Sequence, residues 1–329
     1  FFHFGEKGIG IEEVSPYPHS DTIFSAMCFS HLQLYGQEEL EMLLCNFITR
    51  NPPFLLSSVF PFYGEDSPKI FLFPKPHIIP MDIDHEGGSW DKLKKASYIS
   101  KTVFEDCLVN GVESILRGLS DGNLCLKGET ILDESEASLL KVEKLYEKRQ
   151  SPRNTIKRLK PTSTIYYIGA TSYTNSGMYL LMNTTEEYIG RIDNVLNLLR
   201  DEGIGGERTL GYGRFDFFRE KLEMIEADES EAFVTLSLYH PTEDEVKIFA
   251  ANVRLLRYKL LTRDGFALSP MIKGGKRKRR VRMMLEGSVF PRIEGRSLYG
   301  GFPKVLSKDK TGSHAVYRYG YAFPLAIKV

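Results

Sequence analysis

The chain of 329 residues carries 43 lysines and arginines against 43 aspartates and glutamates, a formal net charge of zero. This balance excludes a protein that attracts nucleic acid through its bulk charge, so a nucleic-acid site must come from local segregation of basic residues. The length predicts two domains, each large enough to bury its own core. The four cysteines lack the C-x-x-C spacing of a zinc site, and no apolar run is long enough to span a membrane. We therefore expect a cytoplasmic protein with buried thiols and no membrane partner.

A strand end at residues 1–4 precedes the first predicted helix, which begins at His19, Ser20 and Asp21. Ser20 is a suitable N-cap, and a second amphipathic stretch follows Gly36. The three adjacent residues also suggest a Ser-His-Asp triad. Because neighbours at a helix start project in different directions, we favour capping, with His19 a candidate hydrogen-bond donor to RNA.

Residues 52–80 are rich in proline and aromatic residues, which predicts short extended segments. Asp82, Asp84 and His85 are the one metal-like cluster, but no further ligand is identifiable nearby. We favour a solvated turn there and expect neither a metal nor a cofactor. Residues 103–119 have helical periodicity, and the charged residues 133–148 predict either a helix or a mobile insertion.

Residues 149–160 switch abruptly to a basic composition, with Arg149, Arg153, Lys157, Arg158 and Lys160. We expect a proline-containing loop here that leads into strands at 164–170 and 177–182. The nearby aromatic residues suit phosphate contact combined with base stacking. These aromatic residues are Tyr166, Tyr167 and Tyr173. A solvated charged face is the alternative interpretation.

Five glycines interleave with basic and aromatic residues in the stretch GIGGERTLGYGRF, at positions 203–215. So many residues without a Cβ predict positive φ angles or a closely approaching backbone. A helix with the capping-box spacing of Thr184 and Glu187 precedes the stretch, and residues 214–218 alternate like a strand after it. This order argues against a Rossmann turn, and the missing Gly-Lys-Ser/Thr excludes a Walker loop. We favour a backbone-binding loop over a simple helix C-cap at Gly203 with a loose connection.

An acidic stretch at 220–231 predicts a domain boundary, which divides the chain into residues 1–225 and 226–329. The second part is predicted to contain strands at 232–238, 253–261 and 315–322, the last after a hairpin around Gly312, and a helix at 243–252. Residues 273–282 include seven basic residues in ten. We expect a basic β-hairpin or loop there that faces RNA or an acidic partner; a disordered loop or a localisation signal is the alternative.

The order of helix, G-x-G-G-x-R-x-x-G-x-G-R-F and strand resembles the glycine-rich loop of RAMP proteins, the RNA-binding subunits of CRISPR effector complexes. Three further stretches resemble one subfamily, the fourth subunit of the type III-A Csm complex. They are HFGEKGIG at 3–10, HSDTIFSA at 19–26 and RNTIKR at 153–158. Arg153, Asn154 and Arg158 match a loop that grips the guide strand in RAMP proteins, whereas Lys157 stands where related sequences often carry an acidic residue.

The fold class that we expect is α+β. The predicted elements of residues 1–225 follow the βαββαβ order of a ferredoxin-like (RRM-like) domain with inserted hairpin and helical segments, and the glycine loop lies near its end. The resemblance implies that residues 226–329 form a second, degenerate ferredoxin-like domain.

The resemblance also implies a non-catalytic RNA-binding subunit of a type III-A CRISPR complex, which serves antiviral defence. Such a subunit holds the 5′ handle of CRISPR RNA (crRNA) and caps the complex, next to the large polymerase-type signature subunit and the backbone RAMP subunit. The alternative is a RAMP endoribonuclease that processes precursor crRNA, for which His3 and His19 are the candidate general acid and base. The predicted RNA-binding residues are His19, Ser20, Arg153, Asn154, Arg158, Gly205, Gly206, Arg208, Gly211, Tyr212, Gly213, Arg214, Lys276, Arg277 and Arg279.

Overall fold

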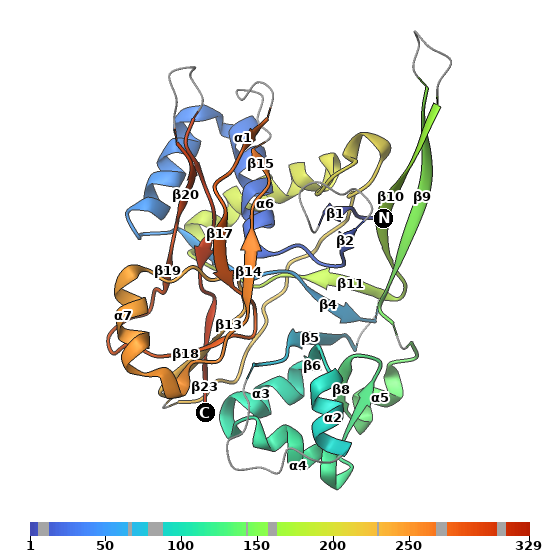
Figure 1. The fold of residues 1–329 in the computed structure, drawn as a ribbon, viewed down its shortest axis with the longest axis vertical. Helices are drawn as coiled ribbons and strands as arrows, with labels where there is room; N and C mark the ends of the chain where they lie inside the picture. Colours follow the sequence, from blue (N-terminus) through green and yellow to red (C-terminus); the bar gives the residue numbers. More distant parts are fainter. Residues whose placement is uncertain are drawn as a thin grey trace.

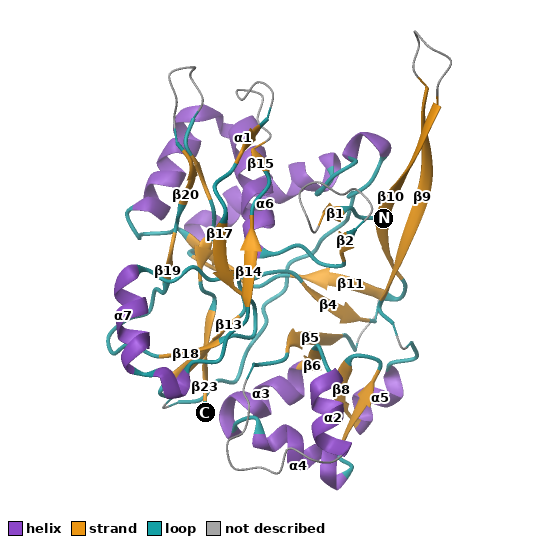
Figure 2. Cartoon of the chain, viewed as in Figure 1, coloured by secondary structure: helices purple, strands orange, loops and turns teal. Residues whose placement is uncertain are grey.

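The computed structural model has a mixed α+β fold, as the sequence predicts (Figure 1). It describes residues 1–5, 13–64, 68–77, 88–142, 144–156, 163–228, 230–267, 275–307 and 314–329. Helices gather at the two ends of the molecule, short strands lie between them, and one long hairpin projects from the body (Figure 2). No helix in these ranges is long and apolar enough to cross a membrane.

Helix α1 (Ser20–Ile48) contains both amphipathic stretches predicted near the N-terminus, joined across a kink at Gly36. Gly36 has a φ of 85°, which breaks the helical backbone there. The N-cap lies one residue earlier than predicted, at His19, and its side chain makes no capping bond. Ser20 cannot cap the helix because its hydroxyl accepts a hydrogen bond from the Leu238 amide at 3.1 Å instead.

Helix α6 (Glu186–Glu202) packs against α1 and buries one apolar face, as its periodicity predicts. The capping box predicted from Thr184 does not form, because Thr184 ends strand β12 (Met182–Thr184) and its hydroxyl donates to the Pro53 carbonyl at 3.1 Å. Strand β12 pairs with β3 (Phe54–Leu56). The N-cap is Thr185, which makes no side-chain cap.

A six-stranded sheet has the strand order β11-β4-β5-β6-β8-β7. Its strands are β4 (Phe60–Tyr63), β5 (Ile70–Pro74), β6 (Tyr98–Ser100), β7 (Leu124–Lys127), β8 (Thr130–Asp133) and β11 (Ser176–Tyr179). All neighbours are antiparallel except β6 and β8. Strands β3, β4 and β5 confirm the short extended segments predicted from the proline-rich sequence.

Four helices accompany this sheet at the lower end of Figure 1. They are α2 (Gly88–Lys95), α3 (Lys101–Asn110), α4 (Glu113–Asp121) and α5 (Glu134–Leu139). The helix predicted at 103–119 is therefore two helices, because Gly111 between them has a φ of 81°. The charged segment 133–148 contains one short helix with an Asp133–Glu136 capping box. Asp82, Asp84 and His85 lie outside the described residues.

A long hairpin formed by β9 (Tyr146–Ile156) and β10 (Ser163–Tyr173) projects from the body (Figure 1). At its base, the Phe2 amide donates to the Thr171 carbonyl at 2.9 Å. Strands β1 (Phe4–Gly5) and β2 (Val14–Ser15) pair beside this base. Arg149 and Arg153 were predicted on a loop, which is wrong: both lie on β9 because it pairs with β10 along its whole length. Lys157, Arg158 and Lys160 are not among the described residues.

The C-terminal part has a three-stranded sheet in the order β18-β13-β23. Its strands are β13 (Ala232–Thr235), β18 (Val289–Pro291) and β23 (Pro324–Ile327). Helix α7 (Glu243–Ala251) confirms the predicted helix. A capping box formed by Thr242 and Glu245 stabilises its N-terminus. The other described strands of this part pair two by two. Strand β14 (Leu260–Arg263) pairs with β17 (Val281–Met284), and β15 (Phe266–Ala267) pairs with β16 (Lys276–Arg277). Strand β19 (Gly300–Gly301) pairs with β22 (Gly320–Tyr321), and β20 (Lys304–Leu306) pairs with β21 (Val316–Tyr317).

Two strand predictions are wrong. Residues 214–218 alternate in polarity but form no strand, because no strand in the described part of the chain pairs with them. Residues 253–255 form a short 3-10 helix, and the strand predicted over 253–261 begins only at Leu260. Gly312 lies outside the described residues.

The hydrophobic core extends across the predicted domain boundary. One cluster joins Phe73 and Phe104 to Val234 and Leu325, all of them buried. A second cluster joins residues of α1 and α6 to Tyr319 and Tyr321. Smaller clusters lie within single parts. The expectation that each part buries its own core is therefore met only in part, and the boundary itself stays a prediction.

Candidate nucleic-acid interface

The glycine loop begins at Gly203, which caps the C-terminus of α6 with a φ of 83°. Gly205, Gly211 and Gly213 also have positive φ angles, of 96°, 85° and 84°. A 3-10 helix, η1 (Arg208–Leu210), lies between them. The predicted left-handed backbone is therefore confirmed.

The missing Cβ atoms of the loop face protein atoms. A Cβ on Gly205 would lie 2.5 Å from the His3 carbonyl oxygen, and one on Gly213 would lie 2.2 Å from the Ile204 carbonyl oxygen. The Gly206 amide donates to the His3 carbonyl at 2.9 Å. These glycines let the loop fold onto itself and onto the N-terminal strand, so the connection after Gly203 is not loose. Gly211 differs, because no atom lies within 4 Å of its Cβ position.

The charged and aromatic side chains of the loop lie at its surface. Arg208 is exposed, 3.8 Å from a Glu202 carboxylate oxygen, and its guanidinium lies 5.7 Å from the Phe29 ring centroid. The Tyr212 ring lies 6.4 Å from that of Phe1. Arg214 lines an open groove of about 510 Å³ together with Arg200, Asp201, Phe215 and Asp216.

His3 connects this loop to the long hairpin. Its Nδ1 lies 2.7 Å from the Gly169 carbonyl oxygen on β10, and its own carbonyl accepts the Gly206 amide. His3 is buried, so its side chain supports the packing of three segments. The N-terminal strand, the glycine loop and the hairpin base consequently form one continuous surface, which the sequence motifs did not predict.

Arg153 and Asn154 are exposed on the hairpin, beyond its base. Gln150 pairs with Gly169, so Arg153 lies about 10 Å farther along β9 at about 3.3 Å per residue. Tyr167 on β10 is 45% exposed and open to stacking. Tyr173 is not available for stacking on a base, because it packs against Phe2 and Tyr17 and its hydroxyl donates to the Pro16 carbonyl.

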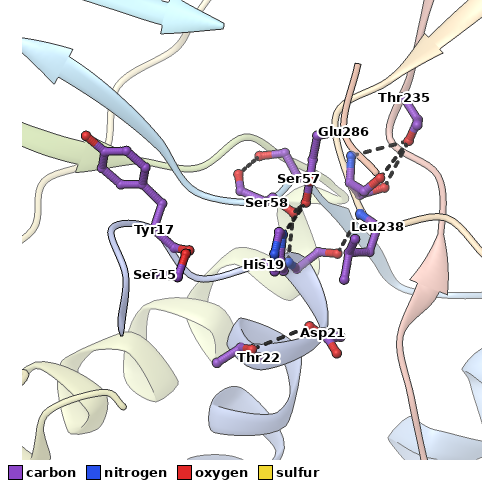
Figure 3. Close-up of polar contacts among 12 residues, drawn as sticks. Ser15, Tyr17, His19, Asp21, Thr22, Ser57, Ser58, Thr235, Leu238 and Glu286 are labelled. Carbon is purple, nitrogen blue, oxygen red and sulfur yellow. Dashed lines mark hydrogen bonds and ion pairs between the residues drawn. The ribbon is translucent and has the colours of Figure 1, made fainter. Parts of the chain in front are cut away.

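His19 belongs to a second group of predicted residues, at the start of α1 (Figure 3). Its Nδ1 lies 2.8 Å from Glu286 Oε1, the oxygen that also accepts a hydrogen bond from the Ser58 hydroxyl. Burial would lower the pKa of His19, but the Glu286 carboxylate outweighs it and raises that pKa above 6.5. His19 is 25% exposed. It therefore keeps a surface through which it can meet a ligand.

Ser20 and Asp21 point away from His19, which excludes the triad in this conformation. The Ser20 amide donates to the Ser58 hydroxyl at 2.8 Å, and Ser20 is fully buried. This burial leaves no atom of Ser20 at the surface for the predicted contact with RNA. Asp21 pairs with Arg263 at 3.0 Å and with Arg318. The sequence analysis missed both arginines because each is more than 200 positions from Asp21 and lies in no local motif.

The described part of the basic stretch supplies strand β16 and the start of β17, and each pairs with a strand outside the stretch, so the stretch is one side of a ladder. We call the pair of β15 and β16, with the residues up to Arg280, the basic hairpin. Phe266 on β15 pairs with Arg277 on β16, and Ala267 pairs with Lys276. Arg277 and Arg279 are exposed. Strand β14, which precedes this hairpin, is bound to the start of α1 through the Arg263–Asp21 pair, whereas Arg208 lies beside Phe29, nine residues after Ser20. At 1.5 Å per residue these two points are about 13 Å apart along α1.

Metal-binding chemistry finds no support in the described ranges, where no three His, Cys, Asp or Glu side chains lie close enough to hold an ion. What the two groups share is positive charge, exposed aromatic rings and backbone turns, which suits a phosphate polymer with unpaired bases.

Comparison with known proteins shows what the chain is similar to. The family model for the CRISPR Csm4 C-terminal domain matches residues 228–327. The CRISPR system Cms protein Csm4 of Mycobacterium tuberculosis (strain CDC 1551 / Oshkosh) is 27% identical over 333 residues, which cover 99% of this chain and 94% of that protein. The chain is Csm4-like.

Solved structures share the Csm4-like fold. One is the Csm3–Csm4 subcomplex of the type III-A CRISPR-Cas interference complex, with a TM-score of 0.62, 20% identity and coverage of 95% of this chain and 94% of the other. Another is a Csm1–Csm4 cassette in complex with cA4, with a TM-score of 0.55, 23% identity and coverage of 97% and 96%. The similarity therefore extends over nearly the whole Csm4-like chain.

Proposed function

We propose that this chain is a non-catalytic RNA-binding subunit of a type III-A CRISPR interference complex, which holds the 5′ handle of crRNA and caps the complex. The observation that carries the proposal is the full-length similarity to Csm4 proteins, together with a glycine loop that packs on the N-terminal strand. Similar chains have been solved with Csm3 and with Csm1, which supports two subunits of the complex as partners. A cytoplasmic location follows from this assignment.

The first RNA contact that we propose is made by the glycine loop and the long hairpin. Arg208, Tyr212 and Arg214 present guanidinium groups and a ring beside the groove at the end of α6. Arg153 and Asn154 are exposed on β9, and we propose that Arg158, which lies outside the described residues, takes part with them. Charge-assisted hydrogen bonds to phosphate and stacking on Tyr167 would hold a single strand along this surface. The backbone turns at Gly205, Gly206, Gly211 and Gly213 would set the shape of the loop.

A second contact would involve His19 with Lys276, Arg277 and Arg279. These residues lie on the start of α1 and on the basic hairpin. Because they lie apart from the glycine loop, we infer that the RNA follows α1 from one group to the other. Such a path uses local charge rather than the net charge of the chain, which is zero.

We propose in addition that residues 1–225 and 226–329 are two ferredoxin-like domains with insertions. The match of a C-terminal domain family to residues 228–327 supports a division near this point. The shared hydrophobic clusters indicate that the two domains fold against each other as one body.

An endoribonuclease that processes precursor crRNA is the competing function. Its candidate histidines are poorly placed, since His3 is buried and His19 is bound to Glu286. Incubation of the purified chain with repeat RNA in EDTA separates the two. Binding without cleavage supports the subunit, whereas a clean cut that His19→Ala abolishes without loss of binding supports the enzyme.

A further inference from the structure

Two guanidinium groups bind one buried carboxylate at the start of α1, and a third cation from the basic stretch lies nearby. Arg263 donates from Nε and Nη2 to the two oxygens of Asp21, both at 3.0 Å. Arg318 donates from Nη1 to Asp21 and from Nη2 to the Asp264 carbonyl at 3.3 Å. The third cation is Lys278, whose backbone amide donates to the carbonyl of Gly265, next to the Asp264 carbonyl that Arg318 binds, and whose pKa responds to Asp21, Arg263 and Arg318. These four side chains define the Lys278 cluster.

Lys278 is the cation that the cluster leaves unpaired. Within the described part of the chain, its ammonium makes no ion pair or hydrogen bond, and only its backbone amide is bonded, to the Gly265 carbonyl at 2.8 Å. Asp264, the other nearby carboxylate, pairs with Arg277 at 3.3 Å and Arg280 at 3.7 Å. The Lys278 cluster together with Asp264, Arg277 and Arg280 therefore carries three more positive than negative charges.

This arrangement is unfavourable for the protein alone. Burial, reinforced by the Arg318 guanidinium, lowers the pKa of Lys278 to about 8. Arg318 is 6% exposed and keeps its Nε without an acceptor. An ammonium that is half-buried among like charges destabilises the folded state unless an anion joins it. A crosslink between α1 and the hairpins would need Arg263 and Arg318 but not Lys278.

We propose that the Lys278 cluster binds a phosphate group of the RNA backbone, with Lys278 as the direct ligand and Arg263 and Arg318 supplying the surrounding positive potential. The proposal rests on the RNA-binding function proposed above. It adds a role for Lys278 within the basic stretch, and for Arg263 and Arg318, which no sequence motif marks. A phosphodiester is a compact monoanion, so it fits a site whose buried cations exceed its carboxylates by two.

The neighbouring side chains favour RNA over an acidic peptide. Phe266 is 47% exposed and stands opposite Arg277 on the same ladder. An exposed ring next to a cation offers stacking for a base beside its phosphate, which an acidic peptide would not use. His19 lies at the same end of α1 and extends the polar surface in that direction.

The test is the salt dependence of binding of fluorescein-labelled oligouridine to the full chain, measured by fluorescence anisotropy. Lys278→Met should flatten the slope of log affinity against log salt by about 0.7, the value for one single-strand phosphate contact. Its thermal midpoint should equal or exceed that of the parent, because an unpaired cation has been removed. Lys278→Arg should keep the parent slope, as should the control Lys247→Met, since Lys247 is exposed on α7.

An unchanged slope in Lys278→Met would overturn the site while leaving the proposed function intact. If the parent binds no RNA, the proposed function fails, and the site is tested with inorganic phosphate alone. A rise of the thermal midpoint in phosphate over chloride of equal ionic strength, absent from Lys278→Met, would still show an anion site. If the thermal midpoint of the parent does not rise in phosphate, the anion site is overturned. Binding of labelled polyglutamate by a chain that binds no RNA would contradict RNA as the ligand of this site.

Discussion

The Arg263 guanidinium donates two hydrogen bonds of 3.0 Å to the Asp21 carboxylate, although the two residues are 242 positions apart in the sequence. Arg318 binds the same carboxylate from a third segment. Asp21 is almost fully buried, and burial opposes its ionisation, but the two guanidinium groups hold its pKa well below the ordinary value. This ion-pair cluster fixes the start of α1 to the C-terminal hairpins.

Asp21→Asn should therefore destabilise the chain by roughly 3–5 kcal/mol, because it leaves two buried guanidinium groups without their counter-charge. Urea unfolding of the isolated chain measures the loss. The control is Asp193→Asn, which removes an exposed pair with Arg219 at 3.0 Å and should change stability by less than about 1 kcal/mol. Equal effects of the two substitutions would show that the Asp21 cluster does not hold the parts together.

The His19–Glu286 pair should make stability depend on pH. The pKa of His19 is raised above 6.5, so its contribution is complete below pH 6.5 and is lost as the pH rises through the folded value. The bonds from His19 and Ser58 outweigh burial and lower the pKa of Glu286 below 4.5, so its contribution is lost as the pH falls. The pair should thus stabilise most between these two values.

Urea unfolding of the parent and His19→Gln tests this window. The difference in the free energy of unfolding should be larger at about pH 6 than at about pH 9, since the contribution of the pair is lost as the pH rises through the raised pKa of His19. Other titrating groups cancel in the difference between the two proteins. A difference that is the same at both pH values would mean that the two side chains carry no ion pair in solution.

Substitutions in the glycine loop should separate its packing from its backbone shape. Gly213→Ala places a Cβ 2.2 Å from the Ile204 carbonyl oxygen, so the two sides of the loop must separate. This movement disturbs the hydrogen bond from the Gly213 amide to the Phe1 carbonyl. Gly211→Ala meets no atom and should cost only about 1–2 kcal/mol for its left-handed backbone. Amide hydrogen exchange of residues 1–5 should therefore accelerate in Gly213→Ala much more than in Gly211→Ala. Equal exchange in the two variants would contradict the packing that we describe.

Arg153 and Arg158 should contribute to RNA binding through their charge. If Arg153 and Arg158 each neutralise one phosphate, replacing both by alanine should flatten the salt slope by about 1.4, similarly for every RNA sequence. The matched control replaces Arg219 and Arg254, which form exposed pairs with Asp193 and Glu231. A salt slope that stays at the parent value would show that the hairpin charges only face solvent.

The sequence predicts those features that depend on local patterns. The apolar period of α6, the positive φ angles of the glycine loop and the basic hairpin all follow from neighbouring residues. Contacts between distant segments do not. The hydroxyl of Ser20 binds the Leu238 amide rather than capping its own helix, and residues 214–218 alternate without finding a strand to pair with. His3 connects the loop and the hairpin through atoms that no spacing rule relates.

The most direct test of the central claim is the affinity of the full chain for crRNA 5′-handle RNA, measured for the parent and Arg208→Ala in EDTA. Arg208 is exposed and makes a long pair with Glu202 and a cation–π contact with the Phe29 ring, so its loss should not unfold the chain. We predict that the parent binds the handle without cutting it, and that Arg208→Ala binds roughly tenfold more weakly while Arg219→Ala binds like the parent. A parent chain that does not bind the handle, or that cleaves it, would contradict the account.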